Sequence, residues 1–427
     1  MTRHQPLSGT LAGLLVVALV GCASWPRNFG ARPCWITTKP VVTRQPIWWH
    51  LFDVTVLSQI ERAFDLVRVS RKFVGAPIHA SNLRGGQVAD STLFTNRDPA
   101  QLSPEQVRWG PTRPEDLARP PLVITKPKIE GATPGFFATD AAGTRYLLKL
   151  DPVDAPELLS GAEVVSSKLL YALGYHVPSY EVLLLRPDEL QIGSGVTVKD
   201  RRGQPSPFTQ AQLHAIVEPR LREGRWRVGV SKILEGEILG PTPFKRFRDC
   251  AEMRALKVAY AWLNDIDSKD HNSLLVWNGK ETVGYLIDFG TSLGADAGRA
   301  GPKQRCAGWL NIVDLHALSL KLVTFGTYQP ICDASDQAVS PSVGLFTRRV
   351  DLDRWKPYAP NLAFEEMTEK DAEWMVRRMA RLSRAQIEAA VSAGQYTNPA
   401  DAAYLLDVLL ARRDAIIRRY FDTTQQQ

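Results

Sequence analysis

The sequence has few of the features that mark membrane-spanning, zinc-binding or repeat proteins. Its one long apolar run, Leu11 to Val20, has ten residues, whereas a membrane-spanning helix needs about 20. The five cysteines and seven histidines contain no Cys-x-x-Cys or His-x-x-x-His spacing of the kind that holds zinc. No segment repeats along the chain. These absences leave a globular protein of roughly 400 residues after the apolar run, enough for one two-lobed unit or two to three domains.

The apolar run at the start is typical of a signal peptide. Arg3 precedes it, and Leu19-Val20-Gly21-Cys22 follows, which resembles the lipobox of bacterial lipoproteins. We therefore expect residues 1–21 to be removed and Cys22 to become a fatty-acylated N-terminus, carrying for example palmitate. Ala23 stands where an Asp would retain the protein at the inner membrane, so the expected location is the cell envelope, at the outer membrane in a Gram-negative cell. The alternative is a plain signal peptide with an incidental cysteine.

The net charge and the other cysteines give little information about the binding partners and the disulfides of the protein. Loss of residues 1–21 removes Arg3 and lowers the net charge from +7 to about +6, which suits anionic partners without choosing among them. The cysteines at 34, 250, 306 and 332 permit two disulfides in an exported protein, in three possible pairings, or free buried thiols.

Residues 22–121 form an extension rich in Trp, Arg and Pro. One helix is predicted at about 55–69, and Trp48-Trp49 is interpreted as a packing anchor. The Pro-rich stretch 113–121 indicates a linker into the next unit.

Residues 122–240 have the pattern of a strand-rich lobe. Strands are predicted at 123–125, 135–139, 144–150, 180–185, 190–192 and 228–234. A helix between the third and fourth strands is predicted to begin at Ser160, because Ser160 and Glu163 match a capping box.

Residues 241–422 have the pattern of a helical lobe. Apolar residues recur at helical spacing over 246–264, and two capping boxes, at 368–371 and 383–386, predict helix starts. A last helix is predicted after Asn398-Pro399. Its four arginines at 412, 413, 418 and 419 are interpreted as a solvated face.

The most informative stretch lies between Asp267 and Gly290. Asp-Ser-Lys-Asp-His-Asn at 267–272 is followed by two strand-like runs around Asn278-Gly279, and then by Asp-Phe-Gly at 288–290. Asn-Gly predicts a hairpin, which would return Asp288 to the side of Asn272. A carboxylate for an acceptor hydroxyl, with an amide oxygen and a second carboxylate for Mg²⁺, is the set of groups that phosphoryl transfer needs. Asp265, just before, is interpreted as an exposed carboxylate at a helix end.

Two residues of the strand-rich lobe complete this pattern. Lys149 ends a predicted strand and Glu163 lies in the next helix, the order in which kinases place a phosphate-binding lysine and its carboxylate partner. The loop from Glu130 to Gly135, with Gly131 and Gly135, precedes the lysine strand. Read alone, Lys149 could be a solvated lysine and Glu163 only a capping residue.

Together these motifs resemble the atypical branch of the protein-kinase-like fold that contains HipA-type and secretory-pathway kinases. The resemblance covers about 122–294 and implies an α+β fold with a strand-rich N-lobe (122–240) and a helical C-lobe (241–422). It implies that Asp267 and Lys269 are catalytic, that Lys149, Glu163, Gly131 and Gly135 bind ATP or another nucleotide, and that Asn272 and Asp288 bind Mg²⁺. The loop at 130–135 departs from GxGxxG and Asp265-Ile266 replaces His-Arg, so the phosphate grip differs from that of typical protein kinases.

The resemblance leaves several functions open. We expect an envelope-anchored phosphotransferase acting on a hydroxyl of a protein, lipid or glycan, with no nucleic-acid partner and an undetermined oligomeric state. A catalytically silent scaffold is the alternative, since the bacterial periplasm is not thought to hold ATP. Transfer of the nucleotide in place of the phosphoryl group would use the same residues.

Overall fold

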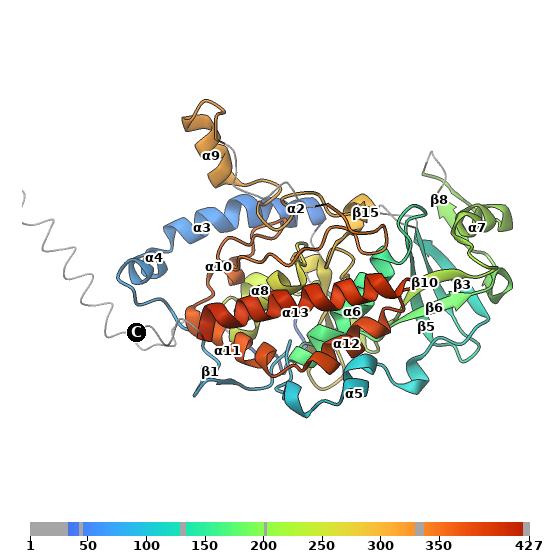
Figure 1. Cartoon of the computed structure of the whole chain (residues 1–427), viewed down its shortest axis with the longest axis horizontal. Coiled ribbons are helices and arrows are strands. Elements are labelled where there is room, and N and C mark those ends of the chain that lie inside the picture. Colours follow the sequence, from blue (N-terminus) through green and yellow to red (C-terminus); the bar gives the residue numbers. More distant parts are fainter. Residues whose placement is uncertain (1–32, 42–45, 129–133, 200–202, 329–336, 422–427) are drawn as a thin grey trace, which may run out of the picture. The chain divides into compact units, whose positions relative to one another are not determined.

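The fold is mixed α+β, with strands concentrated between 122 and 240 and helices dominating from 251 onward (Figure 1). The computed structural model describes residues 33–41, 46–128, 134–199, 203–328 and 337–421. The helices are α2 (Ile47–Phe52), α3 (Ser58–Phe64), α4 (Leu66–Phe73), α5 (Pro104–Trp109), α6 (Leu158–Leu173), α7 (Gln210–Val217), α8 (Ala251–Leu263), α9 (Leu315–Val323), α10 (Leu362–Glu365), α11 (Glu369–Ala380), α12 (Arg384–Ala393) and α13 (Pro399–Phe421). The strands are β1 (Leu83–Arg84), β2 (Gln87–Val88), β3 (Leu122–Lys128), β4 (Gly135–Thr139), β5 (Arg145–Leu150), β6 (Tyr180–Leu185), β7 (Leu190–Ile192), β8 (Thr197–Lys199), β9 (Pro205–Pro207), β10 (Trp226–Lys232), β11 (Glu237–Gly240), β12 (Ser273–Trp277), β13 (Thr282–Leu286), β14 (Ala295–Asp296) and β15 (Gly301–Pro302).

A six-stranded sheet forms the strand-rich lobe, in the order β6-β10-β5-β4-β3-β7. All neighbours are antiparallel except β3 and β7. In β5, Tyr146, Leu148 and Leu150 alternate into a buried core that also contains Phe136 of β4. Because successive residues of a strand point to opposite faces, Lys149 is turned away from this core, toward the face on which α6 lies. The strand-rich sheet that the sequence predicted within 122–240 is therefore present.

Helix α6 begins earlier than the sequence predicted, at Leu158 instead of Ser160. The predicted capping box is wrong, because Ser160 and Glu163 both lie inside the helix. Asp151 caps the first turn from outside, since its Oδ1 accepts hydrogen bonds from Leu159 N at 2.9 Å and Ser160 N at 2.8 Å. The Ser160 hydroxyl also donates to Asp151, at 2.6 Å. Glu163 is thus left without a role in capping, and its side chain can reach Lys149.

Helix α8 and the hairpin β12–β13 form the centre of the helical lobe. Nearly every side chain of α8 is buried. Strand β12 pairs with β11 and, in antiparallel register, with β13. The turn between β12 and β13 contains Asn278 and Gly279, with φ of 93° at Gly279, so the predicted hairpin is confirmed.

The C-terminal helices begin where the sequence predicted. The capping boxes of Thr368 with Asp371 and of Ser383 with Gln386 open α11 and α12. The interpretation of the α13 arginines as one solvated face is wrong for Arg412, which is 3% exposed. Its guanidinium donates to main-chain carbonyls, including that of Trp262 at 2.8 Å. This arginine ties α13 to the end of α8.

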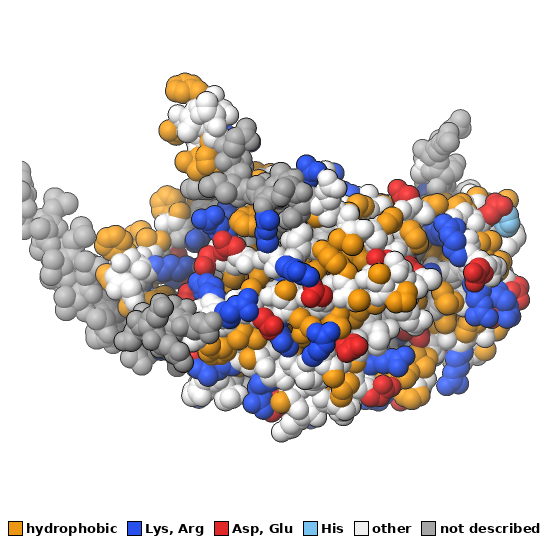
Figure 2. Space-filling model, viewed as in Figure 1, with side chains coloured by type: hydrophobic (Ala, Val, Ile, Leu, Met, Phe, Trp, Pro, Cys, Tyr) orange, Lys and Arg blue, Asp and Glu red, His pale blue; other side chains and the backbone are white. Residues whose placement is uncertain are grey.

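The N-terminal extension is helical over most of 47–73, a longer segment than the predicted 55–69, with a break at Asp65. Trp48 is 66% exposed and Trp49 38% exposed, so the packing-anchor interpretation is wrong. Large exposed apolar side chains are also frequent in the rest of this segment and in and around α9, where Figure 2 shows them on a projecting element. None of the helices described is long and apolar enough to cross a bilayer.

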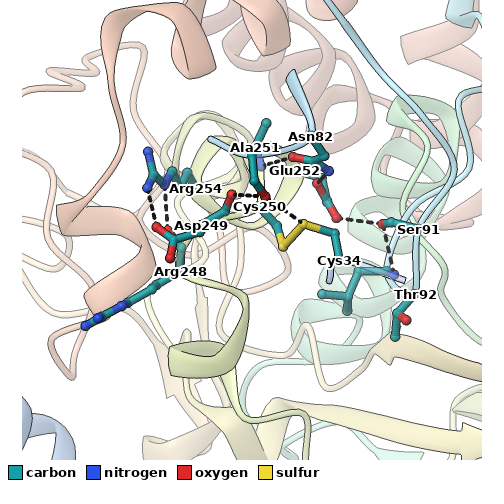
Figure 3. Close-up of a disulfide and its surroundings, with 12 residues drawn as sticks. Cys34, Asn82, Ser91, Thr92, Arg248, Asp249, Cys250, Ala251, Glu252 and Arg254 are labelled. Carbon is teal, nitrogen blue, oxygen red and sulfur yellow. Dashed lines mark hydrogen bonds and ion pairs between the residues drawn. A yellow bond between two sulfur atoms is a disulfide. The ribbon is translucent and has the colours of Figure 1, made fainter. Parts of the chain in front are cut away.

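A disulfide between Cys34 and Cys250 joins this extension to the residue that precedes α8 (Figure 3). Beside it, the buried Glu252 carboxylate accepts hydrogen bonds from Asn82 and Ser91, both at 2.6 Å. Cys306 is also disulfide-bonded. Cys332 and Cys22 lie outside the described residues.

We expect loss of the Cys34–Cys250 disulfide to lower the free energy of unfolding by about 2–5 kcal/mol, because the bond closes a loop of 216 residues and restricts the unfolded chain. The Cys34→Ala/Cys250→Ala double variant leaves no unpaired thiol at this site. Urea unfolding of the variant and the wild type measures the difference. Equal midpoints and slopes would contradict the expected stabilisation.

Candidate functional site

Lys149 lies between two carboxylates that come from distant parts of the sequence. Its Nζ donates to Glu163 Oε1 of α6 and, at 2.8 Å, to Asp288 Oδ1. The Glu163 side chain is 4% exposed, whereas that of Asp288 is 46% exposed. The structure therefore brings together three of the predicted site residues, with one carboxylate buried and the other open to solvent.

The charges of this cluster stabilise one another. Burial alone would lower the pKa of Lys149, but Asp288 and Glu163 outweigh burial and raise it. Lys149 in turn holds the pKa of Asp288 well below its usual range. Burial raises the pKa of Glu163 to about 7, against the opposing effect of Lys149. At neutral pH, Lys149 is thus a cation and Asp288 an anion.

The backbone at Asp288 has φ of 63°, in the left-handed region that non-glycine residues seldom adopt. Conformations of this kind cost on the order of 1–3 kcal/mol and concentrate at functional sites. Two contacts hold Asp288 there: its side chain binds Lys149, and its N–H donates to the Tyr180 hydroxyl at 3.3 Å. The ring of Tyr180 also packs against Phe289, with centroids 5.8 Å apart.

The loop from Asp267 to Asn272 is closed by its own hydrogen bonds. Asn272 Nδ2 donates to the Asp267 carbonyl oxygen at 2.8 Å, and Asn272 N donates to the Lys269 carbonyl oxygen at 2.9 Å. Lys269 Nζ lies 2.5 Å from Asp267 Oδ2. Because the side-chain nitrogen of Asn272 is used within the loop, its side-chain oxygen Oδ1 is the atom left to bind a cation.

The hairpin brings Asn272 and Asp288 together, as predicted. Ile287 N donates to the Asn272 carbonyl oxygen at 3.0 Å, in continuation of the register in which Ser273 pairs with Leu286. Asn272 and Asp288 are thus one residue apart across the end of a two-stranded ladder. An amide oxygen and a carboxylate, both hard oxygen donors, suit Mg²⁺ or another divalent cation.

The predicted phosphate loop is described only at its end. Gly131 lies outside the described residues. Gly135 pairs with Lys149 in the β4–β5 ladder, and a Cβ at this position would meet the Leu148 carbonyl oxygen at 2.5 Å. This close approach of two strands is a sufficient reason for glycine at 135, so its predicted contact with nucleotide stays a prediction.

No family model and no curated protein matches the chain. Among the solved structures that are similar in part are those of two kinases. The Helicobacter pylori proinflammatory kinase CtkA is 12% identical with a TM-score of 0.35, over 70% of this chain and 96% of that protein. The Golgi casein kinase is 10% identical in two structures. The one with Mn/ADP bound has a TM-score of 0.36, over 72% of this chain and 75% of that protein. The other has a TM-score of 0.38, over 93% and 95%.

Two residues beside the cluster were not predicted correctly from the sequence: Asp265 is buried, and Tyr180 was not recognised as part of the site. Asp265 is 2% exposed, not exposed at a helix end. It accepts a hydrogen bond from the Thr291 hydroxyl at 3.3 Å, and burial raises its pKa to about 7. Tyr180, which holds Asp288, lies 108 residues before it. No local pattern in the sequence distinguishes Tyr180 from other strand residues.

Proposed function

We propose that this protein is an ATP-dependent phosphotransferase that acts on a hydroxyl group. The observation that carries the proposal is the contact of Lys149 Nζ with both Glu163 and Asp288, with Asn272 one residue from Asp288 across the hairpin. Four separate segments converge on one small volume. A buried ion pair is costly to maintain and is weak evidence for stability, whereas a cation held by two carboxylates beside a tight Asp–Asn loop suits phosphate chemistry.

The residues fit a nucleotide with a divalent cation. Asp288 offers an ionised, half-exposed carboxylate, and Asn272 offers an amide oxygen oriented by its own hydrogen bond. Lys149 would hold the phosphates, and Glu163 would keep Lys149 in place. When bound, the nucleotide supplies the transferable phosphoryl group and the cation neutralises charge on the phosphates. Mg²⁺ is the cation that we propose.

Asp267 and Lys269 are assigned to the acceptor side. The Asp267 side chain is 20% exposed and contacts Lys269, and not the Lys149 cluster. Such a carboxylate can orient an acceptor hydroxyl and take its proton. Lys269, 25% exposed, places a positive charge where negative charge would develop.

The location in the cell envelope is a further part of the proposal. It is supported by the apolar run and by Cys22, which both lie outside the described residues. Partitioning of the full chain into detergent, and its loss in Cys22→Ala, tests this part separately from the activity.

The test of the proposed function is Mg²⁺-dependent binding of ATP, read by titration calorimetry. We expect the Lys149→Met/Glu163→Gln double variant to bind ATP about 10- to 100-fold more weakly, because a hydrogen bond to a charged group is lost. The double change removes the cation together with its buried partner, so no buried charge is left unpaired. Lys126→Met, on the exposed side of β3, is the matched control and should bind like the wild type.

ATP affinity that is equal in the double variant and the wild type would remove Lys149 from the site. Absence of both nucleotide binding and phosphoryl transfer in the wild type would contradict the phosphotransferase and favour the silent scaffold.

A further inference from the structure

A cavity of about 440 Å³ lies between the N-terminal helical segment and the helical lobe. Its walls come from three parts of the chain: Gln59 and Arg62 of α3, Lys257 of α8, and the segments 311–314 and 353–365. The volume falls in the range of about 300–1,000 Å³ that small-molecule sites occupy. None of the predicted site residues lines this cavity.

The walls of the cavity are attached to the loop that carries Asp267. Tyr358 N donates to the Ile266 carbonyl oxygen at 2.6 Å, and Asn361 Nδ2 lies 3.5 Å from the Ser268 carbonyl oxygen. These contacts fix the 353–365 wall to the residues on either side of Asp267. The N-terminal helical segment, which supplies Gln59 and Arg62 to the cavity, also contacts this loop: His50 of α2 is 3% exposed, and its Nδ1 lies 3.5 Å from Asp270 Oδ2. The cavity wall and the loop are therefore held in a fixed position relative to each other.

Four of the six charged groups that line the cavity are neutralised by one another, and Asp353 pairs with Arg419 of α13 at 2.6 Å. Arg62 pairs with Glu365 at 2.7 Å, and Lys356 pairs with Asp314 at 2.6 Å. Lys257 is different: among the described residues, none forms a hydrogen bond or an ion pair with its amine. Burial lowers the pKa of this lysine. The cavity thus presents one amine donor in a wall with little net charge.

The remaining wall combines aromatic and amide groups. Trp355 and Phe364 lie side by side, with ring centroids 6.3 Å apart, and the indole N–H of Trp355 donates to Asn264 at 3.1 Å. Gln59 Nε2 donates to the Val54 carbonyl oxygen at 3.3 Å and Asn311 Nδ2 to the Pro357 carbonyl oxygen at 2.7 Å, so each amide keeps a second N–H that can donate to a ligand. A ligand for such a wall has many hydroxyls, apolar C–H faces for the rings, and little charge of its own. Those are the properties of a carbohydrate, and not of a lipid chain or a polyanion.

We propose that this cavity binds the acceptor, and that the acceptor is a largely uncharged carbohydrate of about disaccharide size. The proposal rests on the proposed phosphotransferase function and names its substrate class. In the reaction, an acceptor hydroxyl oxygen forms a bond to the γ-phosphorus of ATP while its proton passes to Asp267. The bond from that phosphorus to its bridging oxygen breaks, ADP leaves, and the product is a sugar phosphate monoester.

Sugar binding to the full chain can be measured by saturation-transfer NMR with chitobiose, maltose and lactose as probes. A serine-containing hexapeptide and glycerol 3-phosphate represent the other acceptor classes. At least one disaccharide is expected to bind, and to show saturation transfer from the protein. Lys257→Met and Gln59→Leu are each expected to weaken that binding about 10-fold, through loss of a hydrogen-bonding group. Lys280→Met, in the exposed β12–β13 turn, is the matched control and should leave sugar binding unchanged.

Any of three results would overturn the proposal: no disaccharide binds, only the peptide shows saturation transfer, or both wall variants bind the sugar as tightly as the wild type. ATP titration of the same samples shows that the variants are folded and tests the proposed function separately. Sugar binding without ATP binding would support the cavity as a carbohydrate site and contradict the phosphotransferase.

Discussion

Replacement of Asp288 by asparagine is expected to lower Mg²⁺-dependent ATP affinity by about 100-fold or more. Even residues that only orient a metal ligand change metal affinity about 10- to 100-fold, and Asp288 is placed to bind the metal directly. Asparagine is the informative substitution because it tolerates the left-handed backbone that Asp288 adopts, with φ of 63°, whereas alanine would add strain there. The change therefore removes the charge and preserves the shape.

Calorimetric titration of ATP, with and without Mg²⁺, separates the metal-dependent part of the affinity. Asn272→Ala is expected to reduce the same part by a smaller factor, since it removes a neutral ligand. Asp188→Asn, whose carboxylate is 72% exposed on a distant turn, is the matched control. If Asp288→Asn keeps the full metal dependence, Asp288 is not a metal ligand, and its pairing with Lys149 is structural.

The sequence predicted the parts of the site that depend on short-range order. The Asn278-Gly279 turn and the strands on either side of it determine the register, and the register places Asn272 beside Asp288. The strand alternation of β5 likewise turns Lys149 toward α6. In both cases, a backbone pattern of a few residues positions a side chain, so the geometry could be inferred without knowledge of the rest of the fold.

The errors come from partners that lie outside the local motif, between nine and 150 residues away in the sequence. Ser160 matches a capping box, but Asp151 occupies the helix start and draws Ser160 into the helix. Asp265 is buried because Thr291 and its surroundings cover it, and Arg412 is buried because α13 packs on the end of α8. Tyr180 reaches Asp288 only when the two lobes are assembled. Local propensity gives no information about a partner that lies more than one hundred residues away.

The contact between Lys149 and Glu163 is explained by residue order in the sequence together with burial in the structure. The order of Lys149, Glu163 and Asp288 along the chain was visible in the sequence, but each alone had an ordinary explanation. Once Glu163 has no capping role, its buried carboxylate requires a partner, because an unpaired buried charge is very unfavourable. Lys149 is that partner. The error at the start of α6 therefore strengthens the assignment of Glu163 to the site.

Replacement of Asp267 by asparagine is expected to lower turnover by about 10²- to 10⁴-fold while ATP affinity stays close to that of the wild type. A positioned acid–base group contributes a factor of this size to the chemical step. Asp267 contacts Lys269, and not Lys149 or Asp288, so its loss should leave the nucleotide contacts in place. Asparagine retains the main-chain carbonyl that accepts the bond from Asn272, so the loop should keep its shape.

Autophosphorylation or sugar phosphorylation with γ-labelled ATP, at saturating nucleotide, measures this turnover. Lys269→Met should also lower turnover, because Lys269 contacts Asp267; its charge helps to lower the pKa of Asp288 as well, so a smaller loss of ATP affinity is expected. The comparison with Asp288→Asn is decisive. Asp267→Asn should lose turnover and keep ATP binding, whereas Asp288→Asn should lose metal-dependent ATP binding first. If Asp267→Asn weakens ATP binding as much as Asp288→Asn, the loop carboxylate belongs to the nucleotide site, and the division of the site into nucleotide and acceptor sides is wrong.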